Sequence, residues 1–322
     1  MNFPMLSVTD GIWLLLFYAT MIWGIITLTR NYFSPTKNSF LVADRSLGLV
    51  KGSMSIGAAW TWAPGIFVAA FQGYTNGITG LFWFSFGNIL SLMLFGYFAA
   101  KIRERNPDGF TLSSYLGEKY GKRVQGLVGS GLYTMAIFAA TVNILAGSQS
   151  LEFTTGINYH YTTVAIALLA LSYALRGGMK ASVVTEIFKI SVFYIVWATL
   201  AYFTIDSAGG AHLILDGIGG KTGQGTDIIF SSFASGVIMT FGLPVMLGHF
   251  SSPWADSSFY QRAYAIEKKD IWKSFIFGAL LFSIVPIASG TIGLAAAGLH
   301  LDIPKSQALY TVLVMMGTYL PE

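Results

Sequence analysis

Apolar stretches of about 20 residues recur along the whole chain, and they constrain its fold more than any other feature. A helix of about 20 apolar residues crosses the roughly 30 Å hydrocarbon core of a bilayer. A shorter apolar segment, 306–320, is expected at the membrane interface. The predicted fold class is all-α, a polytopic membrane helix bundle. We predict spans at 11–29, 52–74, 78–100, 124–149, 160–175, 181–204, 228–250 and 273–298.

The composition excludes an ordinary soluble domain. The chain has 322 residues, of which 54% are hydrophobic and only 11% are charged, whereas soluble domains contain about 25% charged residues. It has no cysteine, which excludes disulfides, thiol catalysis and thiolate metal sites. No His-Glu-x-x-His or Gly-x-Ser-x-Gly pattern occurs, and the four histidines are scattered. An enzyme is therefore the least favoured class.

The basic residues cluster on alternate loops between the predicted spans. The formal net charge of +4 could suggest a nucleic-acid partner. With the N-terminus outside, however, all Lys and Arg residues except Lys189, Lys221 and Lys305 fall on inner loops. This distribution follows the positive-inside rule. It predicts a multi-pass protein of the plasma (inner) membrane whose partner is the lipid bilayer, with no role for nucleic acid.

The segment "GIGGKTGQGTD" (217–227) imitates a phosphate-binding loop, but it falls outside the membrane under this topology. No strand precedes it, and no helix opens with Lys-Ser or Lys-Thr after it. We predict a flexible extracellular loop.

Two predicted spans contain helix-breaking residues. Pro64 and Gly65 lie in the middle of the span 52–74. The span 228–250 contains Gly242, Pro244 and Gly248, and Pro253 follows it. Proline removes a helical donor and clashes with the preceding turn. Such breaks persist in a membrane where they line a cavity or bind an ion, although a simple proline kink is the alternative interpretation. We predict unwinding near 59–65 and near 248–253.

The positions of the two breaks predict an internal repeat. If the first span is an extra helix, each broken span opens a set of five. An odd number of spans per set inverts one repeat relative to the other, and interrupted helices at matching positions indicate the binding site of a secondary transporter. We therefore interpret the chain as a single transmembrane domain from a longer protein, truncated in its second repeat. Its parts are an extra helix and cytoplasmic link at 1–51, a first repeat at 52–205 and an incomplete second repeat at 227–322.

Four motifs give the chain a family resemblance. They are "LVADRSLG" (41–48), "LRGGMKASVVTEIFK" (175–189), "DSSFYQRAYAIEKKD" (256–270) and "YLPE" (319–322). With these motifs in this order, the chain resembles the sodium:solute symporter family, which transports sugars, proline, pantothenate, urea and other small solutes. The resemblance implies a LeuT-type inverted repeat with alternating access, in which Na⁺ is the coupling ion for symport of a small organic solute. A transporter-like sensor joined to a signalling domain remains the alternative, and sequence beyond residue 322 would discriminate the two.

The resemblance also implies a sodium site. Backbone carbonyls of Ala58 and Thr61 would bind Na⁺ at the first break, together with hydroxyls of an eighth repeat helix that lies beyond this sequence. Glu186 would line the inner exit path for sodium, where the family has Asp. Lys189, three residues later on the same helix face, could neutralise that carboxylate. The alternative is a snorkelling pair at the membrane interface.

The resemblance places the solute between the two breaks. His249 would be a polar contact and Ser252 would stand where sugar-carrying members have an aromatic gate. Near the first break, we expect Trp62, Gly65 and Gln72 to line the solute site. Packing is the alternative for Trp62, and we interpret Trp60 beside it as a packing residue. A buried histidine satisfied by a neighbouring carbonyl is the alternative for His249. The positions of family sugar contacts are apolar here, at Phe84 and Gly87. A smaller or less hydroxylated solute than a sugar is therefore favoured.

Overall fold

The computed structural model describes residues 6–29 and 36–320, and every regular element within them is helical. Arg30, which was counted among the basic residues of the inner loops, lies outside the described residues. So do residues 321–322, which belong to the fourth motif. A single isolated bridge, Leu47 to Ile266, pairs two extended segments. The all-α class is therefore confirmed. The α-helices are α1 (Val8–Thr29), α2 (Lys37–Val42), α3 (Leu49–Trp60), α4 (Ala63–Arg105), α5 (Leu112–Tyr120), α6 (Lys122–Thr155), α7 (Tyr159–Ala208), α8 (His212–Asp216), α9 (Ser232–Val237), α10 (Leu243–Ala255), α11 (Ser257–Ala265), α12 (Ile271–Gly298) and α13 (Thr311–Tyr319).

Within these described residues, 6 helices are long and apolar enough to cross a membrane. This confirms a polytopic helical membrane bundle. Two predicted spans are not among the six. The span 52–74 is divided between α3 and α4, and the span 160–175 corresponds to a shorter apolar helix, Tyr159–Ser172. The apolar segment near the C-terminus, Ala308–Tyr319, is also shorter than a span, as predicted.

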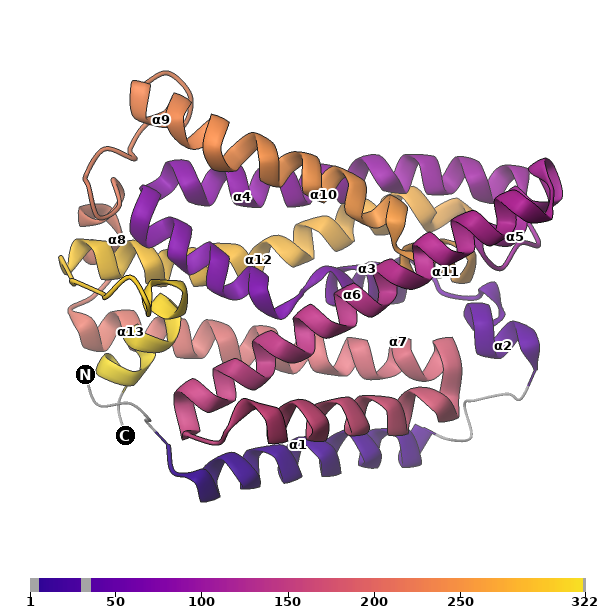
Figure 1. The fold of residues 1–322 in the computed structure, drawn as a ribbon, viewed down its shortest axis with the longest axis horizontal. Coiled ribbons are helices and arrows are strands. Elements are labelled where there is room, and N and C mark those ends of the chain that lie inside the picture. The colour runs from indigo at the N-terminus through magenta and orange to yellow at the C-terminus, as the bar shows by residue number, and fades with distance from the viewer. Residues whose placement is uncertain (1–5, 30–35, 321–322) are drawn as a thin grey trace.

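Two long helices fold back at single glycines. α4 reverses at Gly77 (φ 62°, ψ −150°) and α7 at Gly178 (φ 55°, ψ −146°), so each provides two arms that run in opposite directions (Figure 1). Left-handed backbone of this kind favours glycine. A Cβ on Gly178 would lie 2.4 Å from the Phe40 carbonyl oxygen. Two of the connections between predicted spans, 52–74 to 78–100 and 160–175 to 181–204, are thus bends at single glycines.

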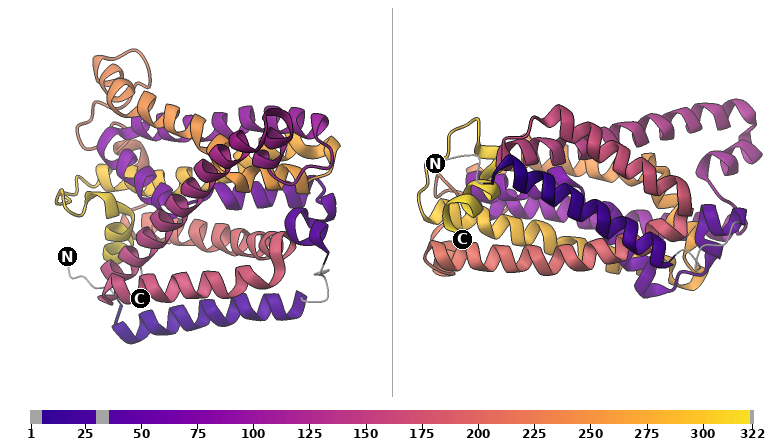
Figure 2. Two further views of the ribbon diagram at one scale, coloured as in Figure 1. Left: turned by 45° about the vertical axis from the view of Figure 1, so that its right-hand side comes forward. Right: turned by 90° about the horizontal axis from the view of Figure 1, so that it is seen from below.

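The central helix of the bundle is α12, which packs against both α3 and α4 (Figure 1). Small residues allow this close approach, as is typical of membrane helix pairs. A Cβ on Gly293 would lie 2.0 Å from the Ala70 carbonyl oxygen, and one on Gly278 would lie 2.7 Å from Ile56. α1 lies on the outside of the bundle against α6 and α7 (Figure 2). The junction between α3 and α4 is therefore held in the interior.

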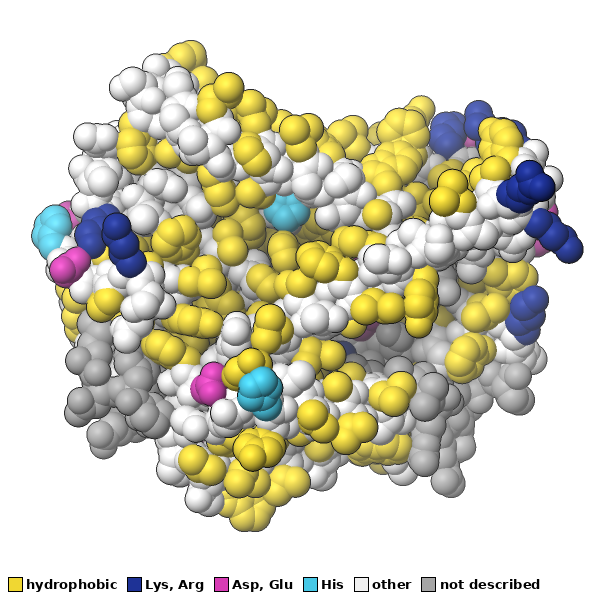
Figure 3. All heavy atoms as spheres, viewed as in Figure 1, with side chains coloured by type: hydrophobic (Ala, Val, Ile, Leu, Met, Phe, Trp, Pro, Cys, Tyr) yellow, Lys and Arg dark blue, Asp and Glu magenta, His cyan; other side chains and the backbone are white. Residues whose placement is uncertain are grey.

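The loops separate to the two ends of the bundle. The Gly77 bend and the loop 209–231 lie at one end, whereas α2, α5 and α11 lie at the other (Figure 1). Basic side chains gather at the end that contains α5, as Figure 3 shows. The alternation of basic loops predicted from the sequence thus corresponds to one charged end of the structure. The side chain of Arg176, counted in that prediction, is not among those described.

The glycine-rich loop 217–227, which was predicted to be flexible, is hydrogen-bonded to the Gly77 bend. The Ile78 N–H donates to the Ile218 carbonyl at 2.9 Å, and the Lys221 N–H donates to the Tyr74 carbonyl at 2.7 Å. A Cβ on Gly225 would lie only 2.0 Å from the Asn76 carbonyl oxygen. The glycines therefore permit close backbone contact, and the loop forms a cap over the bend.

An ion pair holds this cap to the loop after α12. Lys221 Nζ lies 2.7 Å from Asp302 Oδ1 at the surface of the protein. The hydrogen bond from Lys221 lowers the pKa of the Asp302 carboxyl. The same hydrogen bond raises the pKa of the Lys221 ammonium group. Because both groups are exposed to solvent, this pair contributes little to stability.

Candidate functional site

The chain is extended at Thr61 (φ −78°, ψ 98°) and Trp62 (φ −110°, ψ 143°), between the end of α3 and the start of α4. The predicted unwinding near 59–65 is therefore confirmed. The Ala63 N–H donates to Asn143 Oδ1 of α6 at 2.9 Å, and the Gly65 N–H donates to the Trp62 carbonyl at 3.0 Å. Pro64 has no N–H.

These bonds remove the helical donors from a run of carbonyls. In a continuous helix, the N–H groups of residues 63, 64 and 65 would bond the carbonyls of Ala59, Trp60 and Thr61. Here two of those N–H groups bond elsewhere, and the third does not exist. Carbonyl oxygens without a helical partner need another one in a membrane interior. The break therefore supplies hard oxygen ligands.

The prediction of a second break, near 248–253, is wrong. α10 is helical from Leu243 to Ala255, through the interval 248–253, with Pro253 inside it. The irregular turn lies earlier, as a π-helical segment at Ile238–Gly242. The carbonyl that Pro253 would leave unbonded belongs to His249, and it accepts a hydrogen bond from the Ser91 hydroxyl of α4. The helix continues because a side chain distant in sequence replaces the missing donor.

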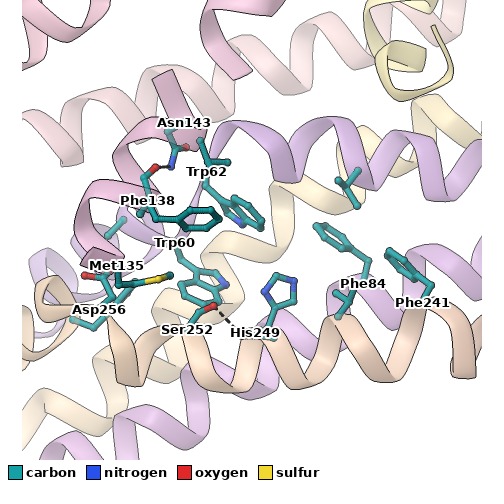
Figure 4. A pocket seen from close by; sticks show the side chains of 17 residues that line it. Trp60, Trp62, Phe84, Met135, Phe138, Asn143, Phe241, His249, Ser252 and Asp256 are labelled. Atoms are coloured by element: carbon teal, nitrogen blue, oxygen red, sulfur yellow. Dashed lines mark hydrogen bonds between the residues drawn. The ribbon is translucent and has the colours of Figure 1, made fainter. Parts of the chain in front are cut away.

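A cavity of about 400 Å³ lies between the break, α6 and α10 (Figure 4). His249 stands in its wall, surrounded by three aromatic rings. Its ring centroid lies 6.0 Å from that of Trp60, 6.0 Å from that of Trp62 and 5.9 Å from that of Phe84, each in an edge-to-face arrangement. Such packing is favourable for aromatic side chains, and it fixes the orientation of the imidazole.

Two polar atoms in this wall have no hydrogen-bond partner among the described residues. They are Nε2 of His249 and Nε1 of Trp60, which belong to side chains only 7% and 6% exposed. An unpaired buried donor or acceptor is costly. Both atoms belong to residues that line the cavity. Their unused hydrogen-bonding capacity makes this cavity the candidate solute site.

The structure brings together some of the residues predicted for the solute and separates others. Trp62, His249 and Ser252 line the cavity, and the Ser252 hydroxyl donates to the Gly248 carbonyl at 2.9 Å. Gly65 lies against Trp62, where its Cβ would come within 3.3 Å of the indole nitrogen. Gln72 does not line this cavity. Its Oε1 accepts a hydrogen bond of 2.6 Å from Asn76, near the Gly77 bend.

Sequence reasoning missed Asn143 and treated Trp60 as packing. Asn143 both lines the cavity and caps the first turn of α4. A polar amide in the middle of an otherwise apolar span is expensive and is often functional. That signal could have identified Asn143. Trp60 offered no such signal, because a tryptophan in an apolar helix is an ordinary core residue.

A second cavity, of about 700 Å³, lies on another side of the same break. It is lined by α1, the break and the second arm of α7, and it brings together Ala58, Thr61 and Glu186, the residues predicted for sodium. Among the residues that the structure describes, no group of three or more His, Asp or Glu could hold a metal ion. The oxygen atoms around this cavity include those of the break and the single carboxylate of Glu186.

Glu186 forms a buried ion pair with Arg262 of α11. Its side chain is 12% exposed and that of Arg262 is 6% exposed, which excludes the snorkelling alternative for Glu186. Ser55 donates to Glu186 Oε2 at 2.6 Å, and Ser182 donates to Oε1 at 3.0 Å. Arg262 Nε also donates to Ser55 Oγ at 3.1 Å. One network thus joins α3, α7 and α11.

This ion pair separates two cavities. Glu186 lines the cavity at the break, whereas Arg262 and Ser182 line a third cavity of about 280 Å³ beside α2 and the Gly178 bend. Sequence reasoning named Lys189 as the neutralising residue and did not consider Arg262. Lys189 lines the cavity at the break with Glu186. A partner 76 residues away gives no local signal.

A helix bundle with a discontinuous helix beside an interior cavity is typical of secondary transporters. The sequence model described as "Sodium:solute symporter family" matches residues 40–316 of this chain, which therefore belongs to that family. The resemblance noted from the four motifs is confirmed.

Several curated proteins are similar to this chain. Probable urea active transporter 2 of Schizosaccharomyces pombe is 28% identical, over 86% of this chain and 42% of that protein. Urea-proton symporter DUR3 of Oryza sativa subsp. japonica is 22% identical, over 92% and 44%. High affinity choline transporter 1 of Homo sapiens is 27% identical, over 82% and 46%. These relatives are transporters, not enzymes, and the chain spans less than half the length of each.

Proposed function

We propose that this chain provides the solute-binding and ion-binding part of a sodium-coupled symporter of LeuT-type inverted-repeat architecture. The observation that most supports this is that two cavities meet at one unwound segment, residues 61–62. One cavity has an aromatic wall with unpartnered nitrogen atoms, and the other has an acidic side chain and oxygen ligands. A solute and a cation that bind on two sides of one unwound segment can be coupled, because each binding event favours the same backbone arrangement.

The solute is a small, uncharged, planar amide of the urea class. Trp60 Nε1–H can only donate a hydrogen bond, so the solute must offer an acceptor such as a carbonyl oxygen. A quaternary ammonium group offers none, although aromatic walls would attract it. A sugar would need many polar partners, and the hydroxyl of Ser252 already bonds within its own helix. Two of the relatives described above are named as urea transporters.

Sodium is the coupling ion in this proposal, held by carbonyl oxygens of the 58–61 segment. The carbonyls of residues 59–61 lack their usual helical donors, and the Ala58 carbonyl accepts the Thr61 N–H at 3.2 Å. Hard oxygen donors left without helical partners suit a hard cation, whereas a backbone carbonyl does not take up a proton near neutral pH. A proton is the competing choice, since one relative is named as a urea-proton symporter. Inward exit of sodium would pass Glu186 and reach the third cavity once the ion pair with Arg262 opens.

The expected topology in the plasma membrane has the N-terminus outside. Cysteine in place of Lys221 should react with an impermeant thiol reagent on intact cells, whereas cysteine in place of Lys119 or Lys268 should react only after permeabilisation. Arg103 is a poor reporter of the inner side, because its side chain is buried against the Tyr264 ring. If intact cells are labelled at positions 119 and 268 but not at 221, the protein has the opposite orientation and this topology is wrong.

The solute assignment predicts the effect of removing each unpartnered nitrogen. His249→Leu and Trp60→Phe should each raise the urea concentration for half-maximal uptake about tenfold, which corresponds to the loss of one buried hydrogen bond. Uptake of radiolabelled urea by proteoliposomes containing the full-length protein measures this. His160→Leu and Trp272→Phe are matched controls, because both residues lie away from the cavity. If the test variants behave like these controls, the solute does not bind at this wall.

A further inference from the structure

Ser91 stands behind the candidate solute site and does not line it. Its side chain is 1% exposed on the second arm of α4, and its hydroxyl donates to the carbonyl of His249. In a regular helix that carbonyl would accept from the N–H of the residue four positions later. That residue is Pro253, which lies inside α10 and has no N–H. The Ser91 hydroxyl therefore replaces a missing helical donor.

The same face of α4 contacts α10 in two further places. Phe84, two turns before Ser91, packs edge-to-face against the imidazole with centroids 5.9 Å apart. Gly87 lies between them along α4, and a Cβ on it would come within 3.2 Å of the Met246 Cα of α10. The backbone of α10 is thus close to α4 at Met246 and at the His249 carbonyl. A shift of α10 relative to α4 would move the imidazole within the cavity.

We infer that Ser91 is a positioning residue for solute binding: it bonds the His249 carbonyl that Pro253 leaves without a donor, and so fixes the imidazole in the cavity wall. This inference rests on the proposed function, because it assumes that His249 contacts the solute. A proline alone would let α10 bend at this turn. With the hydroxyl in place, the helix continues through Pro253 and His249 stays in register with Phe84.

The test is a double-mutant cycle between Ser91 and Pro253 in the full-length protein in proteoliposomes. Ser91→Ala should raise the urea concentration for half-maximal uptake about tenfold while the maximal rate changes less than about twofold, as expected for a displaced binding group. Pro253→Ala restores an N–H that can bond the His249 carbonyl. In that background, Ser91→Ala should therefore change the half-saturating concentration less than about twofold.

Two further variants separate positioning from a general loss of structure. Ser91→Thr keeps the hydroxyl and should stay within about threefold of the unmutated protein, given the added methyl group. Ser283→Ala removes a hydroxyl that bonds only within α12 and should have no effect. If Ser91→Ala raises the half-saturating concentration equally with and without Pro253, or lowers only the thermal midpoint, the hydroxyl does not replace the proline's missing donor.

A second measurement does not depend on transport. With every other histidine of the full-length protein changed to Gln, including His160, His212 and His300, the rate of carbethoxylation by diethylpyrocarbonate reports the accessibility of His249. Ser91→Ala should raise this rate severalfold, and adding Pro253→Ala should restore it. If this cycle holds but the urea concentration for half-maximal uptake does not respond, Ser91 positions His249 and the solute assignment is wrong. If the modification rate is unchanged by Ser91→Ala, the inference is overturned.

Discussion

Replacing Arg262 with glutamine is expected to lower the free energy of unfolding by about 3–5 kcal/mol, the range for breaking a buried ion pair by removing one partner. The loss is large because the Glu186 carboxyl group, 12% exposed, would lose its cationic partner. Ser55 and Ser182 would still donate to that carboxylate, but two hydroxyl donors do not replace a guanidinium in a poorly solvated site.

The double variant Arg262→Gln/Glu186→Gln should recover much of this loss, because removing both charges of a buried pair is often close to neutral. The measurement is the unfolding transition of the purified full-length protein in detergent. Lys269→Gln is the matched control. Its ion pair with Glu267 is exposed at the surface, so its removal should change stability by less than about 1 kcal/mol. A cost for Arg262→Gln no larger than that of the control would mean that the pair is not buried as described.

Closing the break between α3 and α4 is expected to raise the sodium concentration for half-maximal uptake by about tenfold or more, equivalent to at least 1.4 kcal/mol of lost ion binding. The change is Pro64→Ala combined with Gly65→Ala. Alanine at position 64 restores an N–H for the Trp60 carbonyl, and alanine has the highest helix propensity at both positions. The carbonyls would then bond within the helix instead of to an ion.

Pro286→Ala is the control for this variant. Pro286 also lies inside an apolar helix, α12, but it lines neither cavity at the break. Its replacement should leave the sodium requirement unchanged. If the double alanine variant keeps the sodium dependence of the unmutated protein, the ion does not bind at this break, and the carbonyls of the 58–61 segment serve only as a hinge.

The sequence predicted those features that depend on neighbouring residues. Long apolar runs were sufficient to place the helices, and Pro64 with Gly65 was sufficient to place the first break, because no donor nearby in the chain can replace the missing N–H. The same reasoning failed at Pro253, since its substitute donor, Ser91, lies 158 residues before His249. A proline therefore indicates an unsatisfied carbonyl, and only the tertiary structure shows whether another residue satisfies it.

The remaining differences have a similar cause. The glycines of the 217–227 loop suggested flexibility, but they allow the loop to approach the Gly77 bend closely enough to form backbone hydrogen bonds. Glu186 was correctly identified as an unusual charge within a span, yet its partner Arg262 became visible only in the folded chain. Gln72 was expected at the solute site from its distance to the break, whereas its amide faces Asn76 at the other end of the helical arm.

The central claim is that one unwound segment couples a small amide to sodium, and uptake driven by an ion gradient tests it most directly. Proteoliposomes containing the unmutated full-length protein are given radiolabelled urea with an inward sodium gradient and equal pH on both sides. The account predicts transient accumulation of urea above its external concentration, which disappears when the sodium concentrations are equalised. Accumulation that is indifferent to sodium and requires an inward proton gradient would contradict it.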